Sequence, residues 1–335
     1  MKKVFIILSA ALLLFTLCPC SYGEPPQYDL PNASVPIEVL KDKFTDRDRR
    51  NEYTVTTEIK LSDEAVSIEG NGAEADGAVV TIYSEGCYRL TGSLNGQLIV
   101  RANAYDKIQL VLDNAEIKSS ESAAVLIECA DKVFFTTAEN SVNIISSSAD
   151  MKGKKIDAAV YSDCDITFNG TGSLTVECDN GHGILTKDDL KICSGSCSIR
   201  AHKQGLSGKD SVRICGGELE ISSMRDGIHS EHTKSNKGFV LISGGSVDIS
   251  SGKDGIYASG NITVTDGKLN ICSGADGLRE DDNSSCACIR SDTAFVMYGG
   301  EIGLSSPDDA VKCPNVPEIL GGRIFADQNG EKLSF

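Results

Sequence analysis

The sequence predicts an all-β fold, a right-handed single-stranded parallel β-helix with coils of about 22 residues. Two observations predict it. Strand-like segments that end in glycine recur at nearly constant spacing, and the segment after each glycine alternates apolar with polar residues. A third observation agrees with both, because stretches with helical periodicity are nearly absent.

The repeat is clearest in the C-terminal half of the chain. Turn glycines stand at positions 195, 217, 245, 267, 300 and 322, with spacings of 22, 28, 22, 33 and 22 residues. Three spacings are identical, and the two longer ones indicate insertions in loops. A period of this length is typical of solenoids, whose units stack because none can bury its apolar residues alone.

Two further strands are predicted in each coil. After each glycine, two apolar residues alternate with polar ones, which is the pattern of a strand with one buried face. These pairs are Leu174/Val176, Cys197/Ile199, Leu219/Ile221, Val247/Ile249, Leu269/Ile271 and Ile302/Leu304. A short third strand is expected around Val160, Ile184, Leu206, Ile228, Ile256, Leu278 and Val311.

Residues 1–23 have the features of a signal peptide. They open with two lysines, continue with an apolar run at 4–17 that is short for a membrane span, and end at a small-residue cleavage site at Gly23. A lipid anchor on Cys18 or Cys20 is the rival interpretation, which the residues before both cysteines disfavour. The protein is therefore expected to be secreted or at the cell surface.

The rest of the chain is divided into two parts. Residues 24–55 are predicted as an N-terminal extension or cap, in which residues 35–50 form a short helix over the open end of the β-helix. Residues 56–335 are predicted as the β-helix domain. No other run is long and apolar enough to span a membrane.

The chain is strongly acidic. Its formal net charge is −16, and loss of the two lysines of residues 1–23 would make it −18. Such a surface repels nucleic acid and anionic lipid and suits cation binding. We expect a monomer.

The chain has 13 cysteines, of which 11 follow residue 23. No CxxC…CxxC pair exists, so a structural zinc site is disfavoured. Most of the cysteines are interpreted as small buried residues. Cys193 and Cys215 are predicted to stack on adjacent coils, whereas Cys286, Cys288 and Cys313 are the preferred disulfide candidates.

A column of mostly acidic residues, one from each coil, is predicted at the corner before the third strand. Adjacent carboxylates about 5 Å apart repel unless a cation lies between them. Ca²⁺ prefers carboxylate and backbone oxygens, so we predict calcium, with further ligands from Glu231, Glu280 and Asp281. The alternative is that Asp-Gly is simply a good turn dipeptide. The column comprises Asp157, His182, Gln204, Asp226, Asp254, Asp276 and Asp309.

Basic residues flank this column. Lys203, Arg225 and Lys253 precede it, and Arg279 and Lys187 follow it. Together with calcium they are predicted to hold a polyanionic sugar such as polygalacturonate, although an ordinary solvated face is the alternative. The chain has no Trp, which makes an aromatic platform for neutral polysaccharide hard to build, and Tyr257 is the exposed aromatic candidate.

Several motifs carry a resemblance to a known family. They are Gly86–Leu94, Gly96–Val100, Leu110–Ala115, Phe168–Val176 and the Asp-Gly-Ile/Leu corners at Asp226, Asp254 and Asp276. Over roughly residues 50–325 the chain resembles bacterial secreted carbohydrate-binding β-helix proteins that share their architecture with pectate lyases. The resemblance implies calcium binding, no catalysis and acidic sugars as ligands. His182 and Gln204 depart from the corner pattern, which puts metal binding at their coils in doubt.

Three functions follow, in order of preference. The first is non-catalytic, calcium-dependent binding of polysaccharide. The second is a calcium-dependent polysaccharide lyase, with Arg225 or Arg279 as the base. The third is a structural or adhesin β-helix at the cell surface. No nucleophile elbow, P-loop or dinucleotide motif is present.

Overall fold

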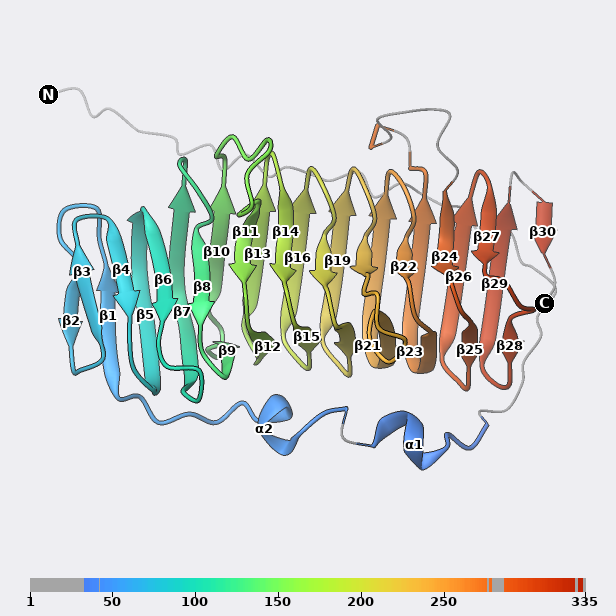
Figure 1. The fold of residues 1–335 in the computed structure, drawn as a ribbon, viewed down its shortest axis with the longest axis horizontal. Coiled ribbons are helices and arrows are strands. Elements are labelled where there is room, and N and C mark those ends of the chain that lie inside the picture. The colour runs from blue at the N-terminus through green and yellow to red at the C-terminus, as the bar shows by residue number, and fades with distance from the viewer. Residues whose placement is uncertain (1–32, 42, 276, 279–285, 329–330, 334–335) are drawn as a thin grey trace, which may run out of the picture.

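The computed structural model describes residues 33–41, 43–275, 277–278, 286–328 and 331–333. It is a parallel β-solenoid of about ten turns with about 24 residues per turn, so the predicted fold class is confirmed (Figure 1). In the regular turns the period is 22 residues, as between β15 (Asp189–Ile192) and β18 (Ser211–Ile214).

Each regular turn contributes one strand to each of three faces, which we call the first, second and third face in chain order. The first and second faces form one 19-stranded sheet, and the third face is a separate 11-stranded sheet. Four long strands bend from the first face into the second: β5 (Gly86–Asn95), β7 (Lys107–Ser119), β21 (Phe239–Ser251) and β23 (Ile262–Ser273).

The remaining strands of the first face are β1 (Thr57–Leu61), β9 (Lys132–Thr137), β12 (Asp165–Gly170), β15, β18, β25 (Phe295–Met297) and β28 (Glu318–Ile319). Those of the second face are β10 (Val142–Ser147), β13 (Ser173–Cys178), β16 (Ser196–Ala201), β19 (Glu218–Ser223), β26 (Glu301–Ser306) and β29 (Arg323–Gln328). The third face contains β3 (Ala73–Asp76), β4 (Val79–Ile82), β6 (Gln97–Arg101), β8 (Val125–Cys129), β11 (Ala158–Ser162), β14 (His182–Thr186), β17 (Leu206–Gly208), β20 (Ile228–Ser230), β22 (Ile256–Ala258), β24 (Ala287–Ser291) and β27 (Asp309–Lys312).

Antiparallel strands close both ends of the solenoid. At the N-terminal end β2 (Ser67–Glu69) pairs with β1, and β3 pairs with β4. At the C-terminal end β30 (Glu331–Leu333) pairs with β29. These pairings occupy strand edges that would otherwise expose unsatisfied backbone groups.

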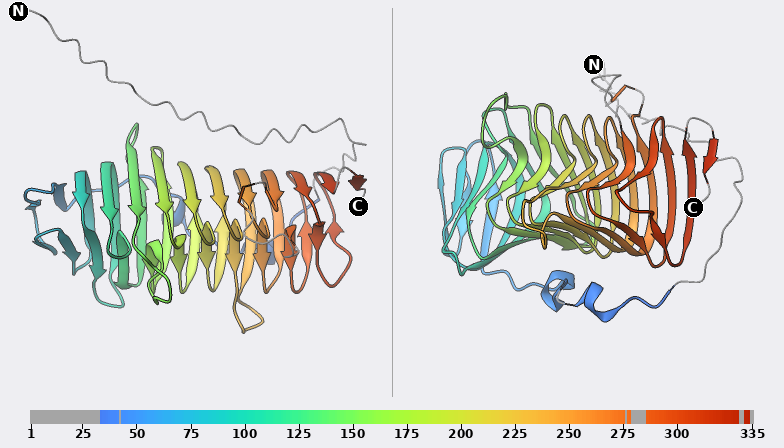
Figure 2. Two further views of the ribbon diagram at one scale, coloured as in Figure 1. Left: turned by 90° about the horizontal axis from the view of Figure 1, so that it is seen from above. Right: turned by 45° about the vertical axis from the view of Figure 1, so that its right-hand side comes forward.

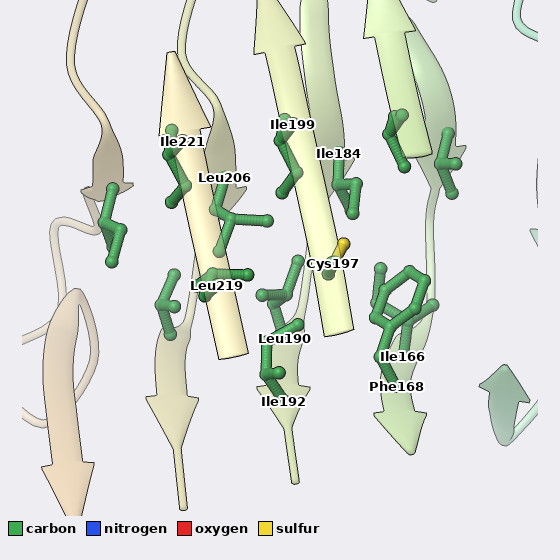
Figure 3. Packing of buried hydrophobic residues seen from close by; sticks show 14 of the residues in the cluster. Ile166, Phe168, Ile184, Leu190, Ile192, Cys197, Ile199, Leu206, Leu219 and Ile221 are labelled. Carbon is green, nitrogen blue, oxygen red and sulfur yellow. The ribbon is translucent and has the colours of Figure 1, made fainter. Parts of the chain in front are cut away.

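The core is a set of apolar ladders along the axis. Alternate residues of each strand point inward, so that Leu219 and Ile221 of β19 continue the ladders of Cys197 and Ile199 in β16 (Figure 3). Glycine is required where neighbouring turns approach closely at the bend between the first and second faces. Gly217 has φ +89°, and a Cβ there would lie 2.8 Å from the backbone oxygen of Gly195.

The N-terminal segment lies along the side of the solenoid, not over its end. Residues 33–41 and 43–56, which we call the strap, run along the first face from the turn of Tyr298 back to β1 (Figures 1 and 2). The strap contains two four-residue helices, α1 (Ile37–Leu40) and α2 (Asp46–Arg49), where one helix was predicted. Neither described helix is long enough to cross a membrane.

Asp48 of α2 anchors the strap. Its side chain is fully buried and accepts hydrogen bonds from the Thr45 backbone N–H at 2.8 Å, Lys191 Nζ at 2.9 Å and Thr167 Oγ1 at 3.1 Å. Lys132 Nζ lies 3.5 Å away. Burial alone would raise the pKa of Asp48, but the hydrogen bonds and the two ammonium charges outweigh it and hold the pKa well below its usual range.

We expect Asp48→Asn to lower the free energy of unfolding by about 3 kcal/mol at neutral pH, because Lys191 would lose its buried counter-ion. Since the folded-state pKa lies below the ordinary value of 3.8, the carboxylate stabilises the fold above that value and stops doing so as the pH falls through the folded pKa. The deficit of the variant should therefore shrink in acid. Urea titrations at several pH values measure it, with Asp46→Asn on the exposed start of α2 as the control.

Candidate functional site

The corner between the second and third faces carries part of the predicted acidic column. Leu206, Ile228, Ile256 and Ile289 are in register on the third face. The residues two positions earlier therefore stack as Gln204, Asp226, Asp254 and Ala287, and the column continues to Asp309, which pairs with Ala287.

Two placements differ from the prediction. Ile289, not Leu278, is the third-strand residue after Ile256, so Ala287 takes the column position that was predicted for Asp276. The reason is that the longest insertion precedes the third strand of that turn. Asp157 lies one residue before the column, because Ala158 pairs with His182. Asp276 itself lies outside the described residues.

The two central carboxylates hold the next turn in place. Asp226 Oδ1 accepts the Asp254 backbone N–H at 3.2 Å, and its Oδ2 lies 2.7 Å from His229 Nδ1. Asp254 Oδ1 accepts the Ala287 N–H at 2.8 Å, and its Oδ2 lies 3.3 Å from Arg290 Nη1. Burial, and then the neighbouring charge of Asp226, raise the pKa of Asp254, while the Ala287 N–H and Arg290 oppose the shift.

The oxygens of Asp226 and Asp254 already face N–H groups, the His229 ring and the Arg290 guanidinium, an arrangement that does not fit calcium between the two carboxylates. Within the described ranges, no three or more His, Cys, Asp or Glu side chains gather as a metal site. Glu231 lies 3.5 Å from His229 Nε2, and Asp309 lies 3.6 Å from Lys312 Nζ. The other predicted ligands, Glu280 and Asp281, lie outside the described residues.

A polar and aromatic row runs along the outer surface of the third face beside this corner. His229, Tyr257 and Arg290 are in register on β20, β22 and β24. The rings of His229 and Tyr257 lie 4.9 Å apart, and the Arg290 guanidinium lies 5.0 Å from the Tyr257 ring centroid. The Tyr257 hydroxyl donates to Asp292 at 2.8 Å. Tyr257 was predicted as a ligand-binding residue. His229 and Arg290 were not, although each directly follows an inward-facing isoleucine.

A basic pocket of about 380 Å³ adjoins this row. Lys187 and Lys209 are exposed and occupy equivalent positions of neighbouring turns, one residue after the paired Thr186 and Gly208. The pocket is thus cationic on a chain of net charge −16. It is lined by Leu185, Thr186, Lys187, Ser207, Lys209, His229, Glu231, His232 and Thr233.

The predicted basic column is present at the corner. Ala201, Ser223 and Ser251 are in register, so Lys203, Arg225 and Lys253, two positions later, stack on one another. Lys203 Nζ lies 2.5 Å from Asp157 Oδ2, which is 3.5 Å from His182 Nε2. Burial alone would raise the pKa of Asp157, but these two partners lower it to about 2. Arg279 lies outside the described residues.

A larger cavity, of about 560 Å³, lies toward the N-terminal end. It is rich in hydroxyl groups from Ser119, Ser120, Ser122 and residues 146–148, and its acidic side chains outnumber its basic ones. Arg200 on its wall pairs with Glu177 at 2.9 Å. Charge therefore distinguishes the two cavities, because an anionic ligand is favoured at the basic pocket and disfavoured here.

Two comparisons with known proteins give the same family description. A family model described as carbohydrate-binding domain-containing protein matches residues 76–331. A curated protein of Acetivibrio thermocellus with the same description is 31% identical over 154 residues, which is 44% of this chain and 54% of that protein. The match thus spans about half the length of this relative. A solved structure described as the polysaccharide lyase-like protein from C. thermocellum, a gadolinium derivative, has a TM-score of 0.62 at 27% identity and covers 79% of this chain and 97% of that one.

Two substitutions separate the roles of the Asp254 side chain. Asp254→Ala should cost about 1–3 kcal/mol, because it leaves the buried Ala287 N–H without an acceptor. Asp254→Asn keeps an acceptor oxygen for the Ala287 N–H. It removes a negative charge that burial already disfavours, as the raised pKa of the Asp254 carboxyl indicates. The loss of unfolding free energy should therefore be much smaller. The difference in melting temperature between wild type and each variant should be the same in calcium and in chelator. A difference seen only in calcium would place a metal at this carboxylate.

Proposed function

We propose, on the premise that this chain belongs to the family of carbohydrate-binding domain-containing proteins, that its third face binds an acidic polysaccharide without cleaving it. The observation that carries the proposal is the basic pocket beside the row of His229, Tyr257 and Arg290. The protein acts outside the cell in this proposal, because residues 1–23 have the features of a signal peptide.

The chemistry of the row suits a uronate polymer. Arg290 uses Nη1 toward Asp254 and has further N–H donors in the same plane, which match a sugar carboxylate. The Tyr257 ring lies between His229 and Arg290 and supports the Arg290 guanidinium by a cation–π contact. Lys187 and Lys209 are compact charges that attract further carboxylates along the polymer. Because successive turns are about 4.8 Å apart, these groups repeat along the solenoid axis, and the polysaccharide is oriented along that axis.

Calcium dependence is a separate part of the proposal, and its support is the sequence alone. The acidic run that includes Asp276, Glu280 and Asp281 supplies the oxygen ligands that Ca²⁺ prefers. Binding by the basic pocket does not require the ion. Retention measured in calcium and in chelator therefore tests the two parts independently.

The test is retention of the mature protein on insoluble polygalacturonate. Arg290→Gln, and the double variant Lys187→Gln with Lys209→Gln, should each weaken binding about tenfold, which corresponds to about 1.4 kcal/mol. Added salt should weaken wild-type binding, because the contacts are between exposed charges. The matched control is Arg200→Gln, which removes a half-exposed, ion-paired arginine from the larger cavity and should bind normally. Loss of binding in the control alone would move the site to that cavity.

One observation favours a second function, a polysaccharide lyase. Asp226 Oδ2 lies 2.7 Å from His229 Nδ1, and this contact favours the tautomer that donates from Nδ1, in which Nε2 can accept a proton. Cationic side chains beside it could stabilise the charge that develops when the proton next to a uronate carboxylate is removed. Unsaturated uronate in the supernatant of the same assay, abolished in His229→Gln, would establish this function. Retention without such product supports the binding protein.

A further inference from the structure

Two cysteines meet beneath the strap, away from the third face. Cys193 and Cys215 follow directly after Ile192 of β15 and Ile214 of β18, which are paired in register. The Cys193 backbone N–H bonds to the turn before it, and the Cys215 N–H donates to Ile192 O at 2.9 Å. The predicted stacking of these two residues on adjacent turns is therefore confirmed.

The separation suits a covalent bond. Paired positions of neighbouring parallel strands lie about 4.8 Å apart, and disulfides join Cα atoms at about 4.4–6.8 Å. The two thiols already share a hydrogen bond. We propose that Cys193 and Cys215 are an oxidation site, where reaction with a small-molecule disulfide forms a disulfide that staples two adjacent turns beneath the strap.

The surroundings assign different roles to the two thiols. The hydrogen bond from Cys193, followed by Arg49 of the strap, outweighs burial and lowers the pKa of Cys215 to about 7. The same hydrogen bond, together with burial, raises the pKa of Cys193. Cys215 is also partly exposed, whereas Cys193 is buried. Cys215 is thus the attacking thiolate, and Cys193 is the resolving thiol.

The reaction balances in two exchange steps. The Cys215 thiolate attacks one sulfur of the external disulfide, breaks its S–S bond and releases one thiolate, which takes up a proton. Cys193 then loses its proton to water and attacks the Cys215 sulfur of the mixed disulfide. The second external thiol leaves, and the Cys193–Cys215 bond forms. The protein gives up two electrons and two protons, and the external disulfide becomes two thiols.

Other cysteines provide an internal comparison. Cys129 interacts electrostatically with Cys164, but burial raises the pKa of Cys164 to about 11, and its sulfur accepts the Ala130 backbone N–H. Cys197 points into the core, where burial raises its pKa to about 12. Thiolate chemistry therefore favours the strap pair over both.

The preferred disulfide candidates of the sequence have other partners. The thiol of Cys288 donates to Ser305 O at 3.0 Å, and that of Cys313 donates to Asn315 O at 2.9 Å. Cys286 contacts Asp308 through both its backbone N–H and its thiol. No disulfide joins any of the three within the described part of the chain.

The test is a time course of oxidation of the reduced mature protein by oxidised glutathione. Samples are quenched, alkylated and mapped by peptide mass spectrometry. Cys193 and Cys197 fall in the same tryptic peptide, so the Cys197→Ser background makes the assignment unambiguous. The Cys193–Cys215 link should form first. Arg49→Gln should slow it about threefold or more without changing the product, because the cation that favours the thiolate is lost.

Two variants make the proposal falsifiable. Cys193→Ser should accumulate glutathione on Cys215, and Cys215→Ser should form no link and no adduct on Cys193. The proposal would be overturned if a Cys129–Cys164 link formed while Cys193 and Cys215 were still reduced and therefore alkylated at the quench. It would also be overturned if the Cys193→Ser protein carried no glutathione on Cys215. Circular dichroism of each reduced variant checks that it is folded. No sugar enters this experiment, so its outcome is independent of the carbohydrate site.

Discussion

The register between successive turns is the constraint on which the rest of the structure depends. Backbone hydrogen bonds place each residue directly over its counterpart about 4.8 Å away, so any side chain type that recurs becomes a ladder. Apolar ladders fill the interior and stabilise the fold. Polar ladders carry a cost, because like charges are brought together. Each polar ladder therefore needs partner groups that compensate its charge. Those partners determine what that part of the surface can bind.

Two charged columns illustrate how that cost is offset. Asp226 and Asp254 stack at the corner, and their oxygens face the N–H groups of the next turn, the His229 ring and the Arg290 guanidinium. On the first face, Lys191 and Arg213 stack, and Asp48 of the strap supplies the missing anion to Lys191. The strap is thus the partner of a cationic ladder. That explains why it lies along the side of the solenoid and not over its end.

Local pattern was enough to predict the fold but not every placement in it. Alternation and glycine spacing are properties of short segments, and both appear in the sequence as they do in the structure. The sequence pattern of a corner before a third strand, however, is also matched by Ala275, Gly277 and Leu278. Only pairing with the neighbouring turn identifies Ile289 as the third-strand residue of that turn. His229 and Arg290 were not predicted as ligand-binding residues for the same reason. They belong to unlike local sequences and become neighbours of Tyr257 only through register.

An acidic chain can still present a surface for an acidic polymer, because electrostatic interactions in salt are local. At physiological ionic strength charges more than about 8 Å apart are largely screened. A ligand at the proposed site on the third face would therefore interact with Lys187, Lys209 and Arg290 far more than with the net charge of the whole chain. A solenoid adds what a compact fold lacks, since its repeats present such groups at a fixed interval. A polymer with carboxylates at regular intervals can then contact several turns at once, and weak individual contacts add up along the axis.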